Sequence, residues 1–149
     1  MSVNPDVAGR TYPSIPPYQV SREAIRAFAQ AVGGENPIHQ DLEAARAAGH
    51  ADLVAPPTFA IIVAQKAEAA VVADGEAGID FSRVVHADQR FTHHRAIVAG
   101  DNLTAATTVD TVRAVGTGAM VTFRTEIIDD DGQAVSTALS SLLVRGEDQ

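Results

Sequence analysis

The feature that most constrains the fold is the long alanine-rich stretch of residues 55–73. No Gly or Pro interrupts it after Pro57, and prolines suit the first turn of a helix, where the N–H groups have no intrahelical partner. Residues 59–64 are apolar on every face, which indicates burial on most sides. We therefore predict a core helix, ended by Asp74-Gly75, around which a sheet wraps. The polar residues of its second half are expected to form a patch on its surface: Gln65, Lys66 and Glu68.

The composition excludes several classes of protein. A chain of 149 residues is long enough to bury a real core, so we expect a single domain over residues 1–149. The net charge of −8 argues against a nucleic-acid partner, because phosphate binding needs Lys and Arg. The apolar stretch is too short and too interrupted by charge to span a bilayer, so no membrane association is expected. No signal peptide is visible, which makes a cytoplasmic location the expectation.

The first half of the chain has the pattern of helices. Ser21 is a good N-cap for a helix that Gly33-Gly34 ends, with apolar residues at helical spacing between them. Asp41 is the N-cap expected for a second, short helix over residues 42–48. Four of the seven prolines precede these helices, so that segment is predicted to be irregular apart from a short edge strand near residues 10–12.

The second half has the pattern of strands. After Asp80 apolar and polar residues alternate, and turn sequences separate four segments: 84–95, 103–109, 121–127 and 135–143. Gly100-Asp101 is expected to make a turn rather than supply a catalytic acid. Asp129-Asp130-Asp131-Gly132 is a strong hairpin signal. Helices followed by an antiparallel meander predict an α+β fold, with the sheet laid on one long helix.

One loop has the residues of a chemical site. In the sequence Asn36-Pro37-Ile38-His39 the proline fixes the turn, so the imidazole just beyond it can be held in one direction. A histidine can accept or donate a proton near physiological pH, which suits general acid–base catalysis. The alternative is that His39 is only a hydrogen-bonding loop residue.

The same loop carries a resemblance to a known family. Residues 33–39 resemble the hydratase-2 motif of MaoC-like enzymes, Gly-Asp-x-Asn-Pro-Ile/Leu-His. Further segments resemble the MaoC dehydratase N-terminal family in the same order along the chain, and HadA-type subunits of (3R)-hydroxyacyl-thioester dehydratases in particular: 18–29, 44–49, 54–59, 85–95 and 98–104. The resemblance implies a hot-dog fold, an antiparallel sheet wrapped around a long central helix. It also implies hydratase or dehydratase chemistry on acyl thioesters of CoA or acyl carrier protein, in fatty-acid metabolism.

The resemblance also implies roles for particular residues. In the family, an Asp and a His orient and deprotonate one water and deliver a proton to the α-carbon of a 2-enoyl thioester. A backbone N–H at the start of the central helix polarises the thioester carbonyl, helped by the helix dipole. By resemblance, the catalytic residues here are His39, Asn36 and Glu35, and the substrate-binding residues are Thr58, Phe59, His86 and Gln89. No cofactor is implied.

The chain departs from the family pattern at two points. Gly34 stands where the catalytic Asp is expected, and Glu35, one residue away, is the only neighbouring acid that could replace it. In active members the helix begins with Ala-His-Gly, whose Gly supplies the polarising N–H. The corresponding residues here, Pro56 and Pro57, have no N–H to donate, which leaves the N–H or hydroxyl of Thr58, displaced by about one residue.

The strand histidines and arginines have structural alternatives. His86 and Gln89 are as compatible with sheet packing or an interface as with a pantetheine or acyl group. His93 and His94 are adjacent on a predicted strand and so point to opposite faces, which argues against a metal site. Arg90 and Arg95 could bind the phosphates of CoA or of acyl carrier protein. The alternative is that both are ordinary solvated charges on a strand.

Three functions are open at this point. In the first, which both departures favour, the chain is a substrate-holding, weakly or non-catalytic subunit of an (R)-specific 3-hydroxyacyl-thioester dehydratase, paired with a catalytic MaoC-like chain. In the second, a homodimer is an active (R)-specific enoyl-thioester hydratase that uses His39. In the third, the protein binds acyl thioesters without being an enzyme. A single hot-dog unit leaves a sheet edge exposed, so we expect a homodimer or heterodimer with paired sheets.

Overall fold

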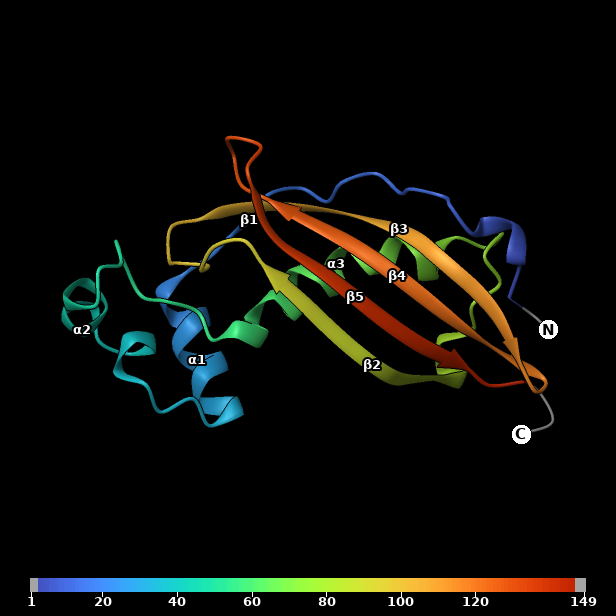
Figure 1. Ribbon diagram of the computed structural model, residues 1–149, viewed down its shortest axis with the longest axis horizontal. Coiled ribbons are helices and arrows are strands. Elements are labelled where there is room, and N and C mark those ends of the chain that lie inside the picture. The colour runs from blue at the N-terminus through green and yellow to red at the C-terminus, as the bar shows by residue number, and fades with distance from the viewer. Residues whose placement is uncertain (1–2, 147–149) are drawn as a thin grey trace.

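One long helix lies along a curled five-stranded antiparallel sheet in the computed structural model, which describes residues 3–146 (Figure 1). The predicted α+β fold with an antiparallel sheet around a central helix is confirmed, and the arrangement is that of a hot-dog fold. The helices are α1 (Arg22–Val32), α2 (Leu42–Ala47) and α3 (Ala60–Ala73). The strands are β1 (Tyr18–Gln19), β2 (Val84–His93), β3 (Asn102–Val115), β4 (Gly118–Ile128) and β5 (Ala134–Val144). Short 3₁₀ turns cover Pro5–Val7, Pro37–His39, Pro57–Phe59 and Phe81–Arg83.

The order of the strands differs from the predicted meander. Strands β3, β4 and β5 are consecutive antiparallel neighbours, but β2 pairs with β5 at the far side, giving the order β1-β3-β4-β5-β2. In that pairing Gln89 of β2 lies opposite Ser140 of β5. An alternating pattern fixes which residues share a face of a strand, but it does not fix which strand lies beside it. The prediction that β2 neighbours β3 was therefore wrong.

The first strand also lies elsewhere than predicted. Near residues 10–12 the backbone makes only one isolated bridge, from Thr11 to Thr108. The two-residue strand β1 follows later, with Tyr18 opposite Leu103. Three prolines lie between the two places: Pro13, Pro16 and Pro17. Because a proline has no N–H to donate to a neighbouring strand, a longer edge strand cannot form there.

Helix α3 supplies the centre of the core. Phe59, just before it, is fully buried, with its ring centroid 5.5 Å from that of Phe28 in α1. Val63 and Val71 are also fully buried, in the two apolar clusters that lie along the helix. The predicted polar patch is wrong in one member. Gln65 and Lys66 are exposed. Glu68, in contrast, is buried against the sheet, with a relative exposure of 8%.

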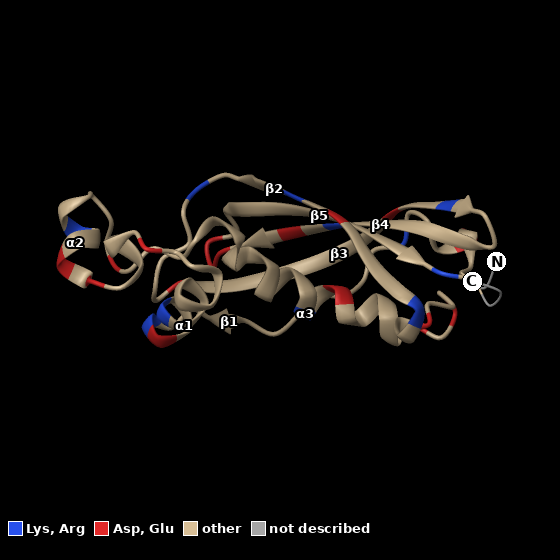
Figure 2. Cartoon of the chain, turned by 90° about the horizontal axis from the view of Figure 1, so that it is seen from below, with Lys and Arg blue, Asp and Glu red and all other residues tan. Residues whose placement is uncertain are grey.

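Helices α1 and α2 lie beyond one end of the sheet, with α1 near the start of α3 and α2 farther out (Figure 1). As predicted, Ser21 caps α1, its Oγ accepting from the N–H of Ala24 at 3.1 Å, and Gly33 ends it with a φ of 72°. Both helices carry acidic and basic residues (Figure 2). No helix among residues 3–146 combines the length and the apolar character needed to cross a membrane.

A salt bridge ties α1 to the segment that leads into α3. Nε and Nη2 of Arg22 donate to the two carboxylate oxygens of Asp52 at 3.0 and 2.9 Å, and the N–H of Leu53 donates to Asp52 Oδ1 at 2.7 Å. These hydrogen bonds, that to Arg22 above all, lower the pKa of the Asp52 carboxyl to about 2. The contact thus joins the first residue of α1 to the segment just before Leu53.

Replacing Asp52 by Asn should lower the free energy of unfolding most at neutral pH and least in acid. The pKa of Asp52 is about 2 in the folded protein, below its usual 3.8. Its contribution to the free energy of unfolding is therefore complete at a pH above the pKa of the unfolded chain, and it is lost as the pH falls through the pKa of the folded protein. We expect Asp52→Asn to be about 1–2 kcal/mol less stable than the parent at neutral pH. Urea unfolding should be measured at several pH values between neutral pH and about 2. The unfolding free energies of Asp52→Asn and of the parent should converge as the pH falls.

The matched control is Asp110→Asn, which changes an exposed carboxyl on β3. Its unfolding free energy should follow that of the parent across the pH range. A stability gap for Asp52→Asn that stays constant with pH would contradict the assigned role of the ion pair.

Candidate functional site

His39 is held between two loops at the end of the sheet where α3 begins. It ends the 3₁₀ turn Pro37–His39, whose N-cap Asn36 accepts the N–H of Ile38 at Oδ1, 3.2 Å away. The N–H of Val54 donates to the carbonyl oxygen of Ile38 at 3.0 Å, and the N–H of Ala55 donates to that of Ile97 at 2.8 Å. The histidine loop, the segment before α3 and the segment after β2 are thus joined by backbone hydrogen bonds.

The imidazole of His39 is buried and fixed in one orientation. Its Nδ1 lies 2.6 Å from the carbonyl oxygen of Val54, and a carbonyl oxygen only accepts, so Nδ1 carries the hydrogen. In the neutral ring Nε2 then holds the lone pair, which is the form a general base needs. The side chain that the motif singled out is therefore oriented by the protein, with its Nε2 lacking a hydrogen-bond partner among the described residues.

Gly34 places a residue without a side chain beside this imidazole. An ideal Cβ at Gly34 would lie 3.5 Å from Cδ2 of His39, the ring carbon bonded to Nε2, and 3.4 Å from the carbonyl oxygen of Ala29. Both distances are at ordinary van der Waals contact, so a Cβ fits there. A side chain at position 34 would therefore start beside the edge of the ring that carries Nε2.

A cavity of about 400 Å³, here called the His39 cavity, opens in front of this histidine. It is lined by Asn36, Ile38, His39, residues 54–57, His93 and residues 95–97. Its wall at the start of α3 is formed by Pro56 and Pro57, neither of which has an N–H. The first N–H of that turn belongs to Thr58, an exposed residue outside the lining.

Arg95 lines the His39 cavity but is occupied by carboxylates. Its guanidinium donates to Asp101 from Nη1 at 2.8 Å and from Nη2 at 3.1 Å, and to Asp129 from Nη2 at 3.2 Å. The bond to Asp101 is the main reason that the pKa of the Arg95 guanidinium is raised. Asp101 also accepts the N–H of Val98, so it holds a turn, as the sequence predicted. Arg90, in contrast, is exposed on β2 and forms an ion pair with Asp88 alone among residues 3–146.

The remaining residues of the predicted site are dispersed. Glu35 is exposed and lies outside the lining of the His39 cavity. Phe59 is fully buried in the core between Phe28 and Tyr18, whose ring centroid is 6.4 Å away. Of the residues predicted for catalysis and binding, the cavity therefore brings together only His39 and Asn36. The catalytic and binding roles of the predicted residues stay predictions.

His86 and Gln89 belong to a separate cluster. Nε2 of His86 lies 3.0 Å from Oε1 of Gln89, and that oxygen lies 2.7 Å from Oγ of Ser140. Oγ of Ser140 is also 2.6 Å from Oε1 of Glu68. Sequence reasoning missed both Glu68 and Ser140. The spacing held a signal for the first, because Glu68 follows the buried Ala64 by four residues and so lies on its face of the helix.

His93 and His94 do not converge on one site. Nδ1 of His93 lies 3.0 Å from Oγ of Ser136, while Nε2 of His94 lies 3.3 Å from Oγ1 of Thr137, the next residue of β5. The ring of His93 also stacks on that of Phe91, with centroids 5.6 Å apart. Within residues 3–146 no three His, Asp or Glu side chains come together as metal ligands.

The chain is similar in sequence to a known protein family and to proteins of two bacterial species. A family model described as the FAS1-like dehydratase domain region matches residues 7–138. A UPF0336 protein of Leifsonia xyli subsp. xyli is 59% identical over 146 residues, which are 98% of each chain. A UPF0336 protein of Clavibacter michiganensis subsp. michiganensis is 51% identical over 148 residues, 99% of each chain. The similarity thus spans both the His39 loop and α3.

A solved structure shows the same fold over nearly all of the chain. The structure of the C-terminally truncated HadBC (3R-hydroxyacyl-ACP dehydratase) complex from Mycobacterium tuberculosis contains a chain that superposes with a TM-score of 0.84. That chain is 32% identical in sequence, and the match covers 96% of this chain and 99% of the other.

We expect Arg95→Ala to destabilise the fold, because it leaves Asp101 and Asp129 without their cation beside the His39 cavity. Losing these charged hydrogen bonds should lower the free energy of unfolding by about 2 kcal/mol. The matched control is Arg90→Ala, which removes a surface ion pair and should change stability by less than about 0.5 kcal/mol. Urea unfolding at neutral pH measures both. Equal effects of the two substitutions would show that the Arg95 contacts do not hold this loop.

Proposed function

This chain belongs to the FAS1-like dehydratase family and has the MaoC-like hot-dog fold, and from that membership we propose that it is the substrate-holding subunit of an (R)-specific 3-hydroxyacyl-thioester dehydratase. Its partner is a MaoC-like chain with an intact Asp and His. The pair removes the C2 proton and the C3 hydroxyl of the substrate as water, or adds water in reverse. The partner supplies both catalytic side chains, and this chain binds part of the thioester.

One observation carries the proposal: Gly34, beside His39, has no side chain. His39 is present, buried and held by Val54, yet the neighbouring position that would carry a carboxylate has no side chain at all. A His without its carboxylate lacks the group that shares the work of orienting and deprotonating water. The chain on its own is therefore expected to be a weak catalyst.

The start of α3 supports the same proposal. A thioester carbonyl is activated by an N–H that points at the developing negative charge. At the cavity wall Pro56 and Pro57 supply none, and Thr58 is displaced along the turn. The cavity keeps the space for a substrate of moderate size, about 400 Å³, without this donor.

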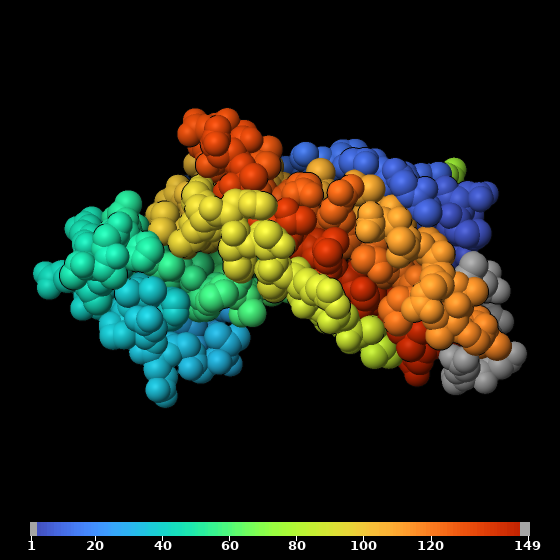
Figure 3. Space-filling view, viewed as in Figure 1, coloured from blue at the N-terminus to red at the C-terminus, as the bar shows by residue number. Residues whose placement is uncertain are grey.

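The edge of the sheet supports a hot-dog partner. Strand β2 is the last in the order, so one side of its backbone has no strand beside it within residues 3–146. Most of its residues are exposed, including the apolar Val85, and it forms the lower rim of the face seen in Figure 3. An exposed edge of ten residues is a template for pairing with another sheet. The structural relative HadBC is described as a complex, which fits such an arrangement.

A second function is favoured by the orientation of His39. Because Nδ1 donates to Val54, Nε2 is free to act on a water without any rearrangement. A homodimer could then hydrate 2-enoyl thioesters with His39 and a bound water, at a rate limited by the missing carboxylate.

An activity assay separates the two functions. The purified chain, a candidate MaoC-like partner and their mixture are each given crotonyl-CoA and longer 2-enoyl-CoA substrates, and loss of the enoyl thioester is followed by its absorbance. We expect the chain alone to be nearly inactive, and the mixture to exceed the partner alone on the longer substrates. Robust turnover by the chain alone, abolished by His39→Ala, would overturn the first function and support the second.

Gly34→Asp tests the observation that carries the proposal. It starts a carboxylate side chain beside the ring of His39, so the variant alone should hydrate crotonyl-CoA at least about tenfold faster than the parent chain. The increase should disappear in the double variant with His39→Ala. Glu35→Gln, which changes the exposed neighbouring acid, is the matched control and should leave the parent rate unchanged. A folded Gly34→Asp chain with no added activity would show that more than the carboxylate is missing.

A further inference from the structure

The N-terminal segment of residues 3–15, here called the strap, lies along the edge of the sheet opposite β2. In Figure 1 and Figure 3 it is the blue segment beside β3 on the upper rim, while β2 forms the lower rim. The sheet has two edges, and the one beside β3 is occupied only by the two-residue strand β1. Most of the β3 edge would therefore be free for another strand if the strap were not there.

Backbone hydrogen bonds hold the strap against β3. On an antiparallel strand, alternate residues turn their N–H and C=O groups to the same side, and these are the groups that a further strand would use. The N–H of Val109 donates to the carbonyl oxygen of Arg10 at 3.0 Å. Three strap N–H groups donate to carbonyl oxygens of alternate residues of β3, at 2.7, 2.9 and 3.0 Å: Gly9 to Val109, Tyr12 to Thr107 and Ile15 to Ala105.

The strap does not pass the pairing on to another strand. Pro13 within it, and Pro16 and Pro17 just after it, have no N–H to donate outward. Where the strap leaves β3, the register of β3 with β4 shifts between Val109 and Thr111, and such a bulge interrupts an edge. The strap therefore covers the β3 edge without forming a new edge of the same kind.

Two buried valines anchor the strap in the core. Val3 and Val7 have relative exposures of 1% and 0%, and they belong to the apolar cluster that also contains Val71 of α3. The N–H of Asn4 donates to the carbonyl oxygen of Ala77, beyond the end of α3, at 2.9 Å. The strap thus begins inside the protein and comes to the edge of the sheet from there.

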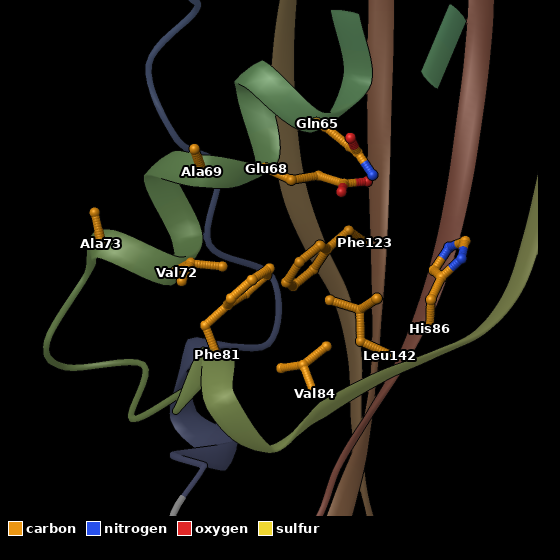
Figure 4. Close-up of a pocket in the computed structure, with 10 residues that line it drawn as sticks. All are labelled: Gln65, Glu68, Ala69, Val72, Ala73, Phe81, Val84, His86, Phe123 and Leu142. Atoms are coloured by element: carbon orange, nitrogen blue, oxygen red, sulfur yellow. The ribbon is translucent and has the colours of Figure 1, made fainter. Parts of the chain in front are cut away.

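A polar latch joins the strap to the end of α3. The Tyr12 hydroxyl and Nη1 of Arg10 donate to the same oxygen, Oδ2 of Asp74, at 2.6 and 2.8 Å. The hydrogen bond from Tyr12 is the largest of the effects that lower the pKa of the Asp74 carboxyl. Arg10 also forms an ion pair with Glu76 at 3.0 Å. In Figure 4 the blue N-terminal segment passes behind α3, and none of the labelled residues that line the cavity belongs to the strap.

The cover on β3 determines how copies of the chain can join. Two β2 edges that pair about a two-fold axis use each other up, which closes the assembly at two chains. A free β3 edge would instead accept the β2 edge of a second copy, whose own β3 edge would accept a third. Such head-to-tail pairing continues without limit unless its rotation closes a ring.

We propose that the strap is an intramolecular guard of the β3 edge: while it is bound the chain joins others only through β2, and once it is released the β3 edge binds β2 of a second copy. A second copy is the occupant because β2 is this chain's own unpaired edge, ten residues long and without a proline. The inference takes from the proposed function only that β2 pairs with another chain. Its tests use no substrate, so they stand or fall separately from the dehydratase role.

Val7→Asp tests the guard by releasing the strap, because a carboxylate is not stable inside the apolar cluster. In sedimentation velocity at neutral pH, the parent should stay at one or two chains, whereas Val7→Asp should form species that grow past two chains with concentration. The matched control is Val71→Ala, which weakens the same cluster from α3 and should keep the size of the parent. A folded Val7→Asp chain that does not grow, or equal growth in the control, would overturn the guard.

A reversible lock separates release of the strap from other effects of Val7→Asp. Thr11 and Thr108 face each other in an antiparallel bridge, with their hydroxyl oxygens 2.9 Å apart, and the chain has no cysteine. Thr11→Cys with Thr108→Cys, added to Val7→Asp and oxidised in dilute solution, should form a disulfide between the strap and β3. The oxidised protein should stay at one or two chains, and reduction should start growth. Growth that oxidation does not prevent would overturn the proposal.

Arg10→Ala with Tyr12→Phe tests the latch in a chain whose buried valines are intact. It removes both side-chain donors to Asp74 from the strap. Hydrogen exchange followed by mass spectrometry should be at least about tenfold faster than in the parent over residues 9–15, and unchanged over α1. The matched control is Arg113→Ala, which removes an exposed arginine of β3 beyond the strap and should exchange like the parent. Exchange over residues 9–15 as slow as in the parent would show that these contacts do not hold the strap.

Discussion

The apolar character of α3 is the constraint on which the rest of the structure depends. The buried residues of α3 are Ala60, Val63, Ala64, Ala67, Glu68 and Val71, which share one face of the helix rather than most of its sides, and other elements must cover that face. The curled sheet covers one side along its whole length, and α1 covers its beginning through the contact of Phe28 with Phe59. Once these contacts fix the helix, the loops that lead to it are fixed as well, and the His39 cavity forms where they meet.

Local features of this fold were predictable from the sequence, because they depend on neighbouring residues. Ser21 as a cap and Gly33 as a left-handed terminus are where the sequence predicted them. The acidic hairpin also forms as predicted, with the N–H of Gly132 donating to the carbonyl oxygen of Asp129. The place of β2 beside β5 was not predictable in the same way. Which strand lies beside another is decided by how all of them cover the helix, and no short pattern records that choice.

The same distinction applies to the candidate site. The motif pointed to His39, and the residue types at positions 34, 56 and 57 showed what is missing, because these are matters of chemical identity. The contacts of Val54 with His39, and of Asp101 and Asp129 with Arg95, join residues that are distant in the chain or on separate turns. Burial of Glu68 escaped prediction because a charged side chain is normally placed in water, and only its partner on β5 makes the interior acceptable.

The position of β5 has a consequence for how the protein is made. Strand β2 finds its only described partner in the last strand, which ends at Val144, and all the long strands that cover α3 follow it in the chain. A ribosome therefore releases the most apolar helix of the molecule well before the residues that will enclose it. Until synthesis is almost complete, the nascent chain exposes α3 together with an unpaired β2, and both are surfaces prone to association. The order of the strands thus gives this small protein a late closure step, at which early capture by another chain competes with folding.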